Sequence, residues 1–257
     1  MIRVGRIHYE GSKQAVPKYE GYAPVVVLTK SSAYGSLGPY ELRTAQNQIM
    51  ENIWQFSKIY PVVPNIEVPY TRWNRKIVWS WPAEQHWDHM TQEPTPAYWR
   101  WRHDGINNDT AVRYPVGMKY RHTCLGAFAP TMDELSSTAP TIGQVRVQDR
   151  LDYVQARKHI YEPLYMDLVR RQRQYGELLD RLESGEKLLI CETDGPHQES
   201  VQYYQETYGM EQDFIQQHSM LATPLSLQVM LNDPKHAYGH GYCLAKALLQ
   251  DLSPENM

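Results

Sequence analysis

Three residues in one short segment have side chains and a spacing that suit acid–base chemistry. Glu51, Gln55 and Lys58 stand at positions i, i+4 and i+7. On an α-helix, side chains with this spacing lie on one face, about one turn apart. A carboxylate, an amide and an ammonium in a row form an acid–base centre flanked by two hydrogen-bonding groups. The alternative is a polar stripe that faces solvent.

The residues around this row indicate which side of the helix is buried. Ile53 and Phe56 supply the opposite, core-facing side, and Trp54 stands at the border. Desolvation near aromatic rings disfavours an ionised carboxylate, which suits Glu51 to a role as general acid or base. The neighbouring Lys58 opposes that shift.

A second acidic group follows the most apolar strand of the chain. Residues 187–193 are predicted to form a buried strand, and Glu192, Asp194 and His197 lie at its carboxyl end, in a turn with Gly and Pro. Side chains in such turns often face a cleft, which makes the two carboxylates candidates for catalysis. Alternatively, Asp194 only holds the turn through Asx hydrogen bonding.

A glycine-containing loop, residues 232–241, precedes the last predicted helix. Backbone N–H groups at a helix start can hold a phosphate, and glycines let the backbone approach it. The histidines stand four apart, a metal-ligand spacing, but the glycines argue against a helix there, so we predict no metal. A plain Asx–Gly turn remains open. The candidate binding residues are Lys235, His236, Gly239, His240 and Gly241.

Arginines alternate with aromatic residues in a third region. Arg100 lies among Tyr and Trp residues in 98–102, and Arg113 precedes a tyrosine. Arg and Trp together can bind a phosphate and a flat ring, which makes both arginines candidate substrate contacts. The alternative is a buried Trp face with solvated arginines. The nearby sequence His-Trp-Asp-His at 86–89 is a weak metal pattern.

The composition narrows the class of protein. The chain has 257 residues, 42% hydrophobic and 21% charged, with a net charge of −3. These values are typical of a soluble globular protein without a general basic field for nucleic acid. No apolar run approaches the roughly 20 residues that span a bilayer, and no signal-peptide core is evident. The cysteines (Cys124, Cys191 and Cys243) suggest neither disulfides nor a metal site, so we expect a cytoplasmic protein.

Common enzyme signatures are missing. The sequence contains no GxGxxG, Walker A, GxSxG or HExxH motif. Dehydrogenase, P-loop ATPase, α/β-hydrolase and zincin assignments are therefore poorly supported, and we expect no cofactor.

The pattern of elements predicts one α+β domain over residues 1–257, mostly helical with a few short strands. Thr95 and Pro96 form a helix start, and Pro163 is expected to kink or divide the longest helical segment. Predicted strands cover 4–9, 24–29, 77–81 and 187–193. Predicted helices cover 46–59, 147–183, 201–208, 225–231 and 242–249.

The helix with Glu, Gln and Lys resembles the hallmark of the NADAR family (NAD- and ADP-ribose-associated, also called YbiA-like). In that family Gln follows Glu by four residues and Lys by seven, after a loop similar to Leu-Gly-Pro-Tyr at 37–40. Residues 240–249 are similar to the family's last helix, but His240 and Tyr242 replace its Gly and Asn. Residues 189–194 are similar to a Glu-plus-Asp element, with a shorter spacing and without its Trp-Gly.

The resemblance implies a mostly helical α+β fold and N-glycosidase chemistry on ribosyl–base bonds, including ADP-ribose attached to nucleobases. Glu51 would stabilise an oxocarbenium-like sugar and activate water. Gln55 and Lys58 would orient it or bind ribose and phosphate, and Asp194 or Glu192 would be the second carboxylate. The loop 235–241 would hold a phosphate, and Trp or Tyr residues, Trp54 among them, would stack on the base.

Two other functions remain open. One is an enzyme that modifies a base within nucleic acid, for which a local arginine patch would be needed. The other is a nucleotide-binding protein that has lost catalysis, in keeping with the departures at His240 and Tyr242. Nucleic acid is therefore a possible partner, a membrane is not expected, and the oligomeric state is left open. The candidate arginine patch consists of Arg100, Arg102, Arg113 and Arg121.

Overall fold

The computed structural model describes residues 1–11, 13–29, 33–68, 79–136 and 147–252. It confirms an α+β fold in which helix predominates. Internal contacts divide the chain into two compact units. The terminal unit consists of Met1–Gly38 and Tyr165–Met257, and the central unit of Pro39–Leu164. The sequence analysis did not predict this division.

A four-stranded sheet forms the centre of the terminal unit. Its order is β14 (Ser219–Leu221), β1 (Ile2–Arg6), β13 (Leu188–Glu192) and β4 (Ala23–Val26). Strands β1, β13 and β4 run parallel, and β14 runs antiparallel to β1. Every residue of β13 is buried, as expected for a parallel strand covered on both faces.

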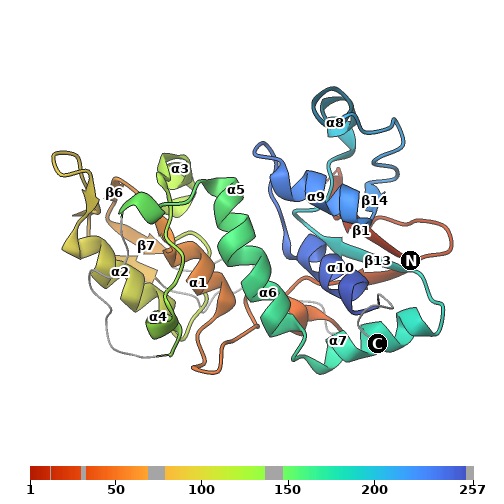
Figure 1. Cartoon of the computed structure of the whole chain (residues 1–257), viewed down its shortest axis with the longest axis horizontal. Coiled ribbons are helices and arrows are strands. Elements are labelled where there is room, and N and C mark those ends of the chain that lie inside the picture. Colours follow the sequence, from red (N-terminus) through yellow and green to blue (C-terminus); the bar gives the residue numbers. More distant parts are fainter. Residues whose placement is uncertain (12, 30–32, 69–78, 137–146, 253–257) are drawn as a thin grey trace. The chain divides into compact units, whose positions relative to one another are not determined.

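Helices flank this sheet. Helix α10 (His240–Asp251) packs against β1 and β13 and against α9 (Pro224–Asn232) (Figure 1). Helix α9 begins with a capping box, in which the hydroxyls of Thr223 and Ser226 each accept a hydrogen bond from the other residue's backbone N–H. The other helices of the unit are α7 (Arg173–Glu183) and α8 (Val201–Tyr208), and α6 (Glu162–Val169) carries the chain from the central into the terminal unit.

Aromatic packing forms the core of the central unit. The ring of Phe56 on α1 (Met50–Phe56) lies 4.6 Å from Trp101 on α2 (Pro96–Ile106) and 4.9 Å from Trp79. Helix α2 begins as predicted, with Thr95 as the cap and Pro96 as the first residue. The Trp-rich segment therefore mainly builds the core, which was the alternative interpretation of that segment.

A buried ion pair crosses this core. Arg102 is 0% exposed and binds both carboxylate oxygens of Glu134, at 2.6 and 3.0 Å. Tyr98 and the carbonyl of Phe128 accept further hydrogen bonds from the guanidinium. Arg102 is thus a core residue and does not belong to a surface patch for nucleic acid, which corrects that part of the sequence analysis.

Short elements complete the structure. In the terminal unit these are β2 (His8–Glu10) and β3 (Lys13–Ala15). In the central unit they are β5 (Lys58–Ile59), β6 (Val62–Val63), β7 (Ile66–Val68), β8 (Trp79–Trp81), β9 (Glu84–Gln85), β10 (Trp87–Asp88), β11 (Glu93–Pro94), β12 (Gly126–Ala127), α3 (Gly117–Tyr120), α4 (Met132–Ser136) and α5 (Tyr153–Ala156). Ile77 and Val78 of one predicted strand lie outside the described residues.

Two predicted helices differ from those observed. The helix expected at 46–59 covers only Met50–Phe56, because the chain then pairs as β5 with β12. The long segment 147–183 turns at residues 170–172, between α6 and α7, and not at Pro163. Pro163 is the second residue of α6 and follows a π-helical stretch, Arg157–Tyr161, that joins α5 to α6 without a break, so the helix is widened just before the proline and does not end there.

Two helical glycines should respond in opposite ways to alanine. A Cβ on Gly105 would overlap the ring of Phe56, which Trp79 and Trp101 hold in place. We expect Gly105→Ala to destabilise the protein by about 1–3 kcal/mol through overpacking. Nothing lies near a Cβ on Gly176 in α7, so Gly176→Ala should stabilise by about 0.5–1 kcal/mol. Urea unfolding measures both, and equal effects would contradict the assigned packing.

Candidate functional site

The predicted Glu51, Gln55 and Lys58 form one hydrogen-bonded chain in the central unit. The amide Nε2 of Gln55 donates to Oε1 of Glu51 at 2.8 Å, and Nζ of Lys58 donates to Oε1 of Gln55 at 3.0 Å. The first two residues are on α1, as their spacing predicts. Lys58 lies beyond the helix in β5 and reaches back to it. The polar row is therefore not a solvated stripe, since Glu51 is only 6% exposed.

Aromatic rings surround this row. The ammonium of Lys58 lies 4.5 Å from the centre of the Trp54 ring, and Trp54 packs 5.1 Å from the ring of Tyr161. Burial lowers the pKa of Lys58, and the charge of Glu51 opposes that shift. Trp54 thus already serves as a platform for Lys58, which leaves less of its ring for the predicted stacking on a base.

The other candidates of the central unit, Arg100 and Arg113, take no part in the hydrogen bonds described for this row. Arg100 on α2 is more than half exposed and pairs with Glu84 at 3.5 Å. The guanidinium of Arg113 lies 5.0 Å from the ring of Tyr114. Arg113 thus lies beside a tyrosine, as predicted. Arg100 instead forms an exposed ion pair.

In the terminal unit, two predicted groups meet at the carboxyl end of β13. Oε1 of Glu192 accepts the backbone N–H of Gly241 at 2.7 Å, and Oε2 lies 3.0 Å from Nδ1 of His240. Nε2 of His240 lies 2.9 Å from the carbonyl of Val27. Since an ionised carboxylate and a carbonyl only accept hydrogen bonds, both ring nitrogens are donors and His240 is an imidazolium.

The electrostatics agree with this protonation. Burial acts to lower the pKa of His240, but the charge of Glu192 and the hydrogen bonds to Glu192 and Val27 outweigh it, and the pKa is raised. Asp194, half-buried in the turn after β13, adds its negative charge to the same effect. Asp194 and Glu192 thus both act on the start of α10.

The glycines of the loop bring a carboxylate, and no phosphate, against the helix start. A Cβ on Gly239 would overlap the carboxylate of Glu192, and one on Gly241 would come within 2.7 Å of it. The positive end of the helix dipole and the Gly241 N–H are therefore satisfied by the chain's own anion. Glu192 occupies the place that the sequence analysis assigned to a phosphate at Gly241.

The remaining loop residues belong to a different cluster. His236 hydrogen-bonds to Asp233, which belongs to the predicted loop 232–241, and to Ser200, which lies outside every predicted site. No motif indicates Ser200, because its pairing with His236 spans 36 positions. Lys235 is exposed, and its ammonium lies 4.3 Å from the ring of Tyr203.

The candidate residues therefore fall into two sets. Glu51, Gln55 and Lys58 belong to the central unit, and Glu192 and Asp194 belong to the terminal unit, together with the loop 235–241. A single site that contains both sets stays a prediction.

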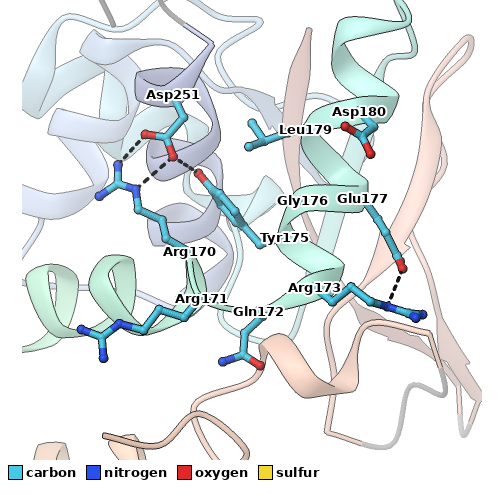
Figure 2. Close-up of a pocket in the computed structure, with 10 residues that line it drawn as sticks. All are labelled: Arg170, Arg171, Gln172, Arg173, Tyr175, Gly176, Glu177, Leu179, Asp180 and Asp251. Atoms are coloured by element: carbon cyan, nitrogen blue, oxygen red, sulfur yellow. Dashed lines mark hydrogen bonds and ion pairs between the residues drawn. The ribbon is translucent and has the colours of Figure 1, made fainter. Parts of the chain in front are cut away.

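A hollow beside the turn between α6 and α7 contains several arginines (Figure 2). Arg170 and Tyr175 both point toward Asp251 there. Because each arginine already faces a carboxylate of the chain, the hollow does not favour an anion. The pairs are Arg170–Asp251, Arg171–Asp167 and Arg173–Glu177, with N···O distances of 2.8, 2.6 and 3.0 Å.

The weak metal pattern at 86–89 has a structural explanation. His86 is buried 5.1 Å from the ring of Trp101, and burial lowers its pKa to about 4, so the ring is neutral. Asp88 accepts backbone hydrogen bonds from Met90 and Thr91 in a turn. In the part of the chain that the structure describes, no three His, Cys, Asp or Glu residues are grouped to hold a metal ion.

No protein-family model, characterised protein or solved structure matches the chain. Among the described residues, no helix has both the length and the apolar character needed to cross a membrane.

The Glu192–His240 pair should make stability depend on pH. The pKa of His240 is raised on folding, so its contribution is full below the unfolded value of 6.5 and disappears as pH rises through the raised value. We expect Glu192→Gln to destabilise by about 3–5 kcal/mol at about pH 6 and by less at about pH 9. Urea unfolding across this range measures the difference.

Glu206→Gln is the control, because Glu206 is exposed on α8 and hydrogen-bonds only to Gln202 among the contacts described for it. Its stability difference from the wild type should stay small at every pH. A Glu192→Gln difference that does not change with pH would contradict the charged state assigned to His240.

Proposed function

We propose that the chain is an N-glycosidase-type hydrolase that acts on a ribosyl–base bond, in a nucleotide or an ADP-ribosylated nucleobase. The observation that carries the proposal is the hydrogen-bonded chain from Lys58 through Gln55 to Glu51. This row of side chains combines the buried carboxylate of Glu51, held in one orientation, with the cation of Lys58 at its other end.

This chain supports the chemistry in a specific way. Breaking an N-glycosidic bond leaves positive charge on the sugar, and a preorganised carboxylate stabilises it. Gln55 holds one oxygen of Glu51, so the side chain is oriented before substrate binds. Lys58 in turn orients the Gln55 amide, because its ammonium can only donate to the amide oxygen and thereby turns the NH₂ toward Glu51.

The burial of Glu51 adds to this effect. Because little water surrounds a buried side chain to screen its charge, the attraction between a buried carboxylate and a developing cation is stronger. The same Glu51 then accepts a proton from the water that attacks the sugar, and hydrolysis is complete when that proton passes to the released base. The resemblance of this helix to the NADAR hallmark points to the same chemistry.

The two alternatives have less support from the described residues. Base modification within nucleic acid depends on an arginine patch, and Arg102 of that patch is in the core with Glu134 as its partner. A purely nucleotide-binding role would require neither the orientation of Glu51 nor its burial with Lys58.

The activity test follows base release. The protein is incubated with ADP-ribosylated nucleic acid, free ADP-ribosyl nucleosides or NAD, and the released base is separated by chromatography. We expect release from at least one substrate, and a loss of about 10²–10⁴-fold in Glu51→Gln, the range for removing an acid–base group. Glu41→Gln, a change at an exposed glutamate of the same unit, should keep full activity.

Release from none of the three substrates would refute the proposed function. Release that Glu51→Gln leaves unchanged would keep the activity and refute the assigned mechanism.

A salt titration tests the nucleic-acid alternative. Because the net charge is −3 and Arg102 is buried, we expect binding of single- or double-stranded polyanions to be weak, with a shallow dependence on salt. Fluorescence anisotropy of a labelled oligonucleotide from 50 to 200 mM salt, a range of about fourfold, measures the slope. A steep slope would favour base modification within nucleic acid.

A further inference from the structure

Three side chains of the terminal unit are hydrogen-bonded in line. Oγ of Ser200 lies 2.9 Å from Nε2 of His236, and Nδ1 of His236 lies 2.6 Å from Oδ2 of Asp233. A hydroxyl, an imidazole and a carboxylate joined in this order form the arrangement that activates a serine nucleophile.

The carboxylate of Asp233 is held in place from several sides. Asp233 is 1% exposed, and it accepts hydrogen bonds from the hydroxyls of Tyr203 at 2.9 Å and Tyr204 at 2.7 Å. The backbone N–H of Lys235 adds a third at 2.8 Å. Burial alone would raise the pKa of Asp233, but these hydrogen bonds and that of His236 outweigh it, so the carboxylate is ionised.

The ionised Asp233 determines the direction of the other hydrogen bonds. A carboxylate only accepts, so Nδ1 of His236 carries a proton and donates it. In the neutral ring, Nε2 is then the acceptor, and the hydroxyl of Ser200 donates to it. This is the tautomer in which an imidazole can take the proton of a serine.

Ser200 gives up its usual local hydrogen bond for this contact. It is the N-cap of α8, where a serine normally accepts the N–H of the second or third helical residue. No such bond is present at Ser200. Ser200 also ends a 3-10 turn, Gln198–Ser200, that runs directly into α8, and its hydroxyl faces His236.

The row runs from a buried residue to two partly exposed ones. Asp233 is buried, the side chain of His236 is 11% exposed, and Ser200 is half-buried. The end of the row that would react is thus not sealed within the core. Two cationic residues, Arg6 and Lys235, lie close to the row. The ring of His197, hydrogen-bonded to Arg6 at 2.8 Å, lies 5.2 Å from that of His236, and Lys235 bonds Asp233 through its backbone.

We propose that Ser200 is the nucleophile of a second active site, with His236 as general base and Asp233 as the positioning residue, that hydrolyses carboxylic esters. It shares no residue with the site around Glu51, and it does not use the GxSxG turn whose absence argued against an α/β-hydrolase. Its nucleophile instead directly precedes helix α8, as its N-cap.

The reaction balances with water as the only co-reactant. Oγ of Ser200 attacks the ester carbonyl carbon while its proton passes to Nε2 of His236. The C–O bond to the alcohol then breaks, and the imidazolium returns that proton to the leaving alkoxide. Water, deprotonated by His236, attacks the acyl-serine, which releases the carboxylic acid and restores the Ser200 hydroxyl.

The test uses a fluorescent fluorophosphonate, which reacts with activated serines. Oγ of Ser200 would form a bond to phosphorus, fluoride would leave, and His236 would take the proton. We expect labelling of the full chain, with the label on the peptide that contains Ser200 by mass spectrometry, and no labelling of Ser200→Ala. Ser184→Ala is the matched control, since the hydroxyl of the exposed Ser184 bonds only the carbonyl of Arg181 among the contacts described for it.

The positioning role of Asp233 has its own readout. Asp233→Asn should slow both labelling and p-nitrophenyl acetate hydrolysis by up to about 10⁴-fold, the loss known for such a change in a serine triad. Tyr203→Phe removes only one of the hydrogen bonds that Asp233 accepts, and should slow labelling with the thermal midpoint nearly kept. It therefore keeps the test decisive if Asp233→Asn does not fold.

Several results would overturn this proposal. These are a wild-type protein that takes no label, labelling of Ser200→Ala at the wild-type rate, a label on another residue, and a Tyr203→Phe variant that folds and reacts at the wild-type rate. None of them bears on base release by the site around Glu51, so the two proposals fail separately.

Discussion

The buried carboxylate of Glu192 is the constraint on which the terminal unit depends. Strand β13 lies between β1 and β4 with every residue buried, so its last side chain has no water to solvate it. The start of α10 must then supply a hydrogen-bond donor and a cation, which are the Gly241 N–H and the His240 ring. Glycine at 239 and 241 follows from this approach, because a Cβ at either position would meet the carboxylate.

Other buried charges also lack water, and hydrogen-bonded side chains act as their partners. Arg102 and Glu134 satisfy each other within an aromatic core, where an unpaired charge would be strongly destabilising. Glu51 accepts a hydrogen bond from Gln55, which in turn accepts one from Lys58.

The unusual aromatic composition has two separate uses. Tryptophan, with 7 residues against 3 of phenylalanine, builds much of the central core, as Trp79 and Trp101 show around Phe56. Tyrosine, with 19 residues, supplies hydroxyl donors to carboxylates of the terminal unit, as Tyr203 and Tyr204 do for Asp233 and Tyr175 does for Asp251. A tyrosine has the apolar body that burial requires and one hydroxyl for the acid.

The sequence alone determined features that depend on neighbouring residues. Helix α8 covers the predicted 201–208, β13 ends at the predicted acidic turn, and Gln55 bonds Glu51 because residues four apart meet on any helix. Tertiary structure decided the rest. Lys58 reaches Gln55 from a strand, Arg102 is in the core, and Glu192 fills the site expected for a phosphate. Ser200 meets His236 from 36 residues away. Such contacts depend on how distant elements pack, which no local spacing encodes.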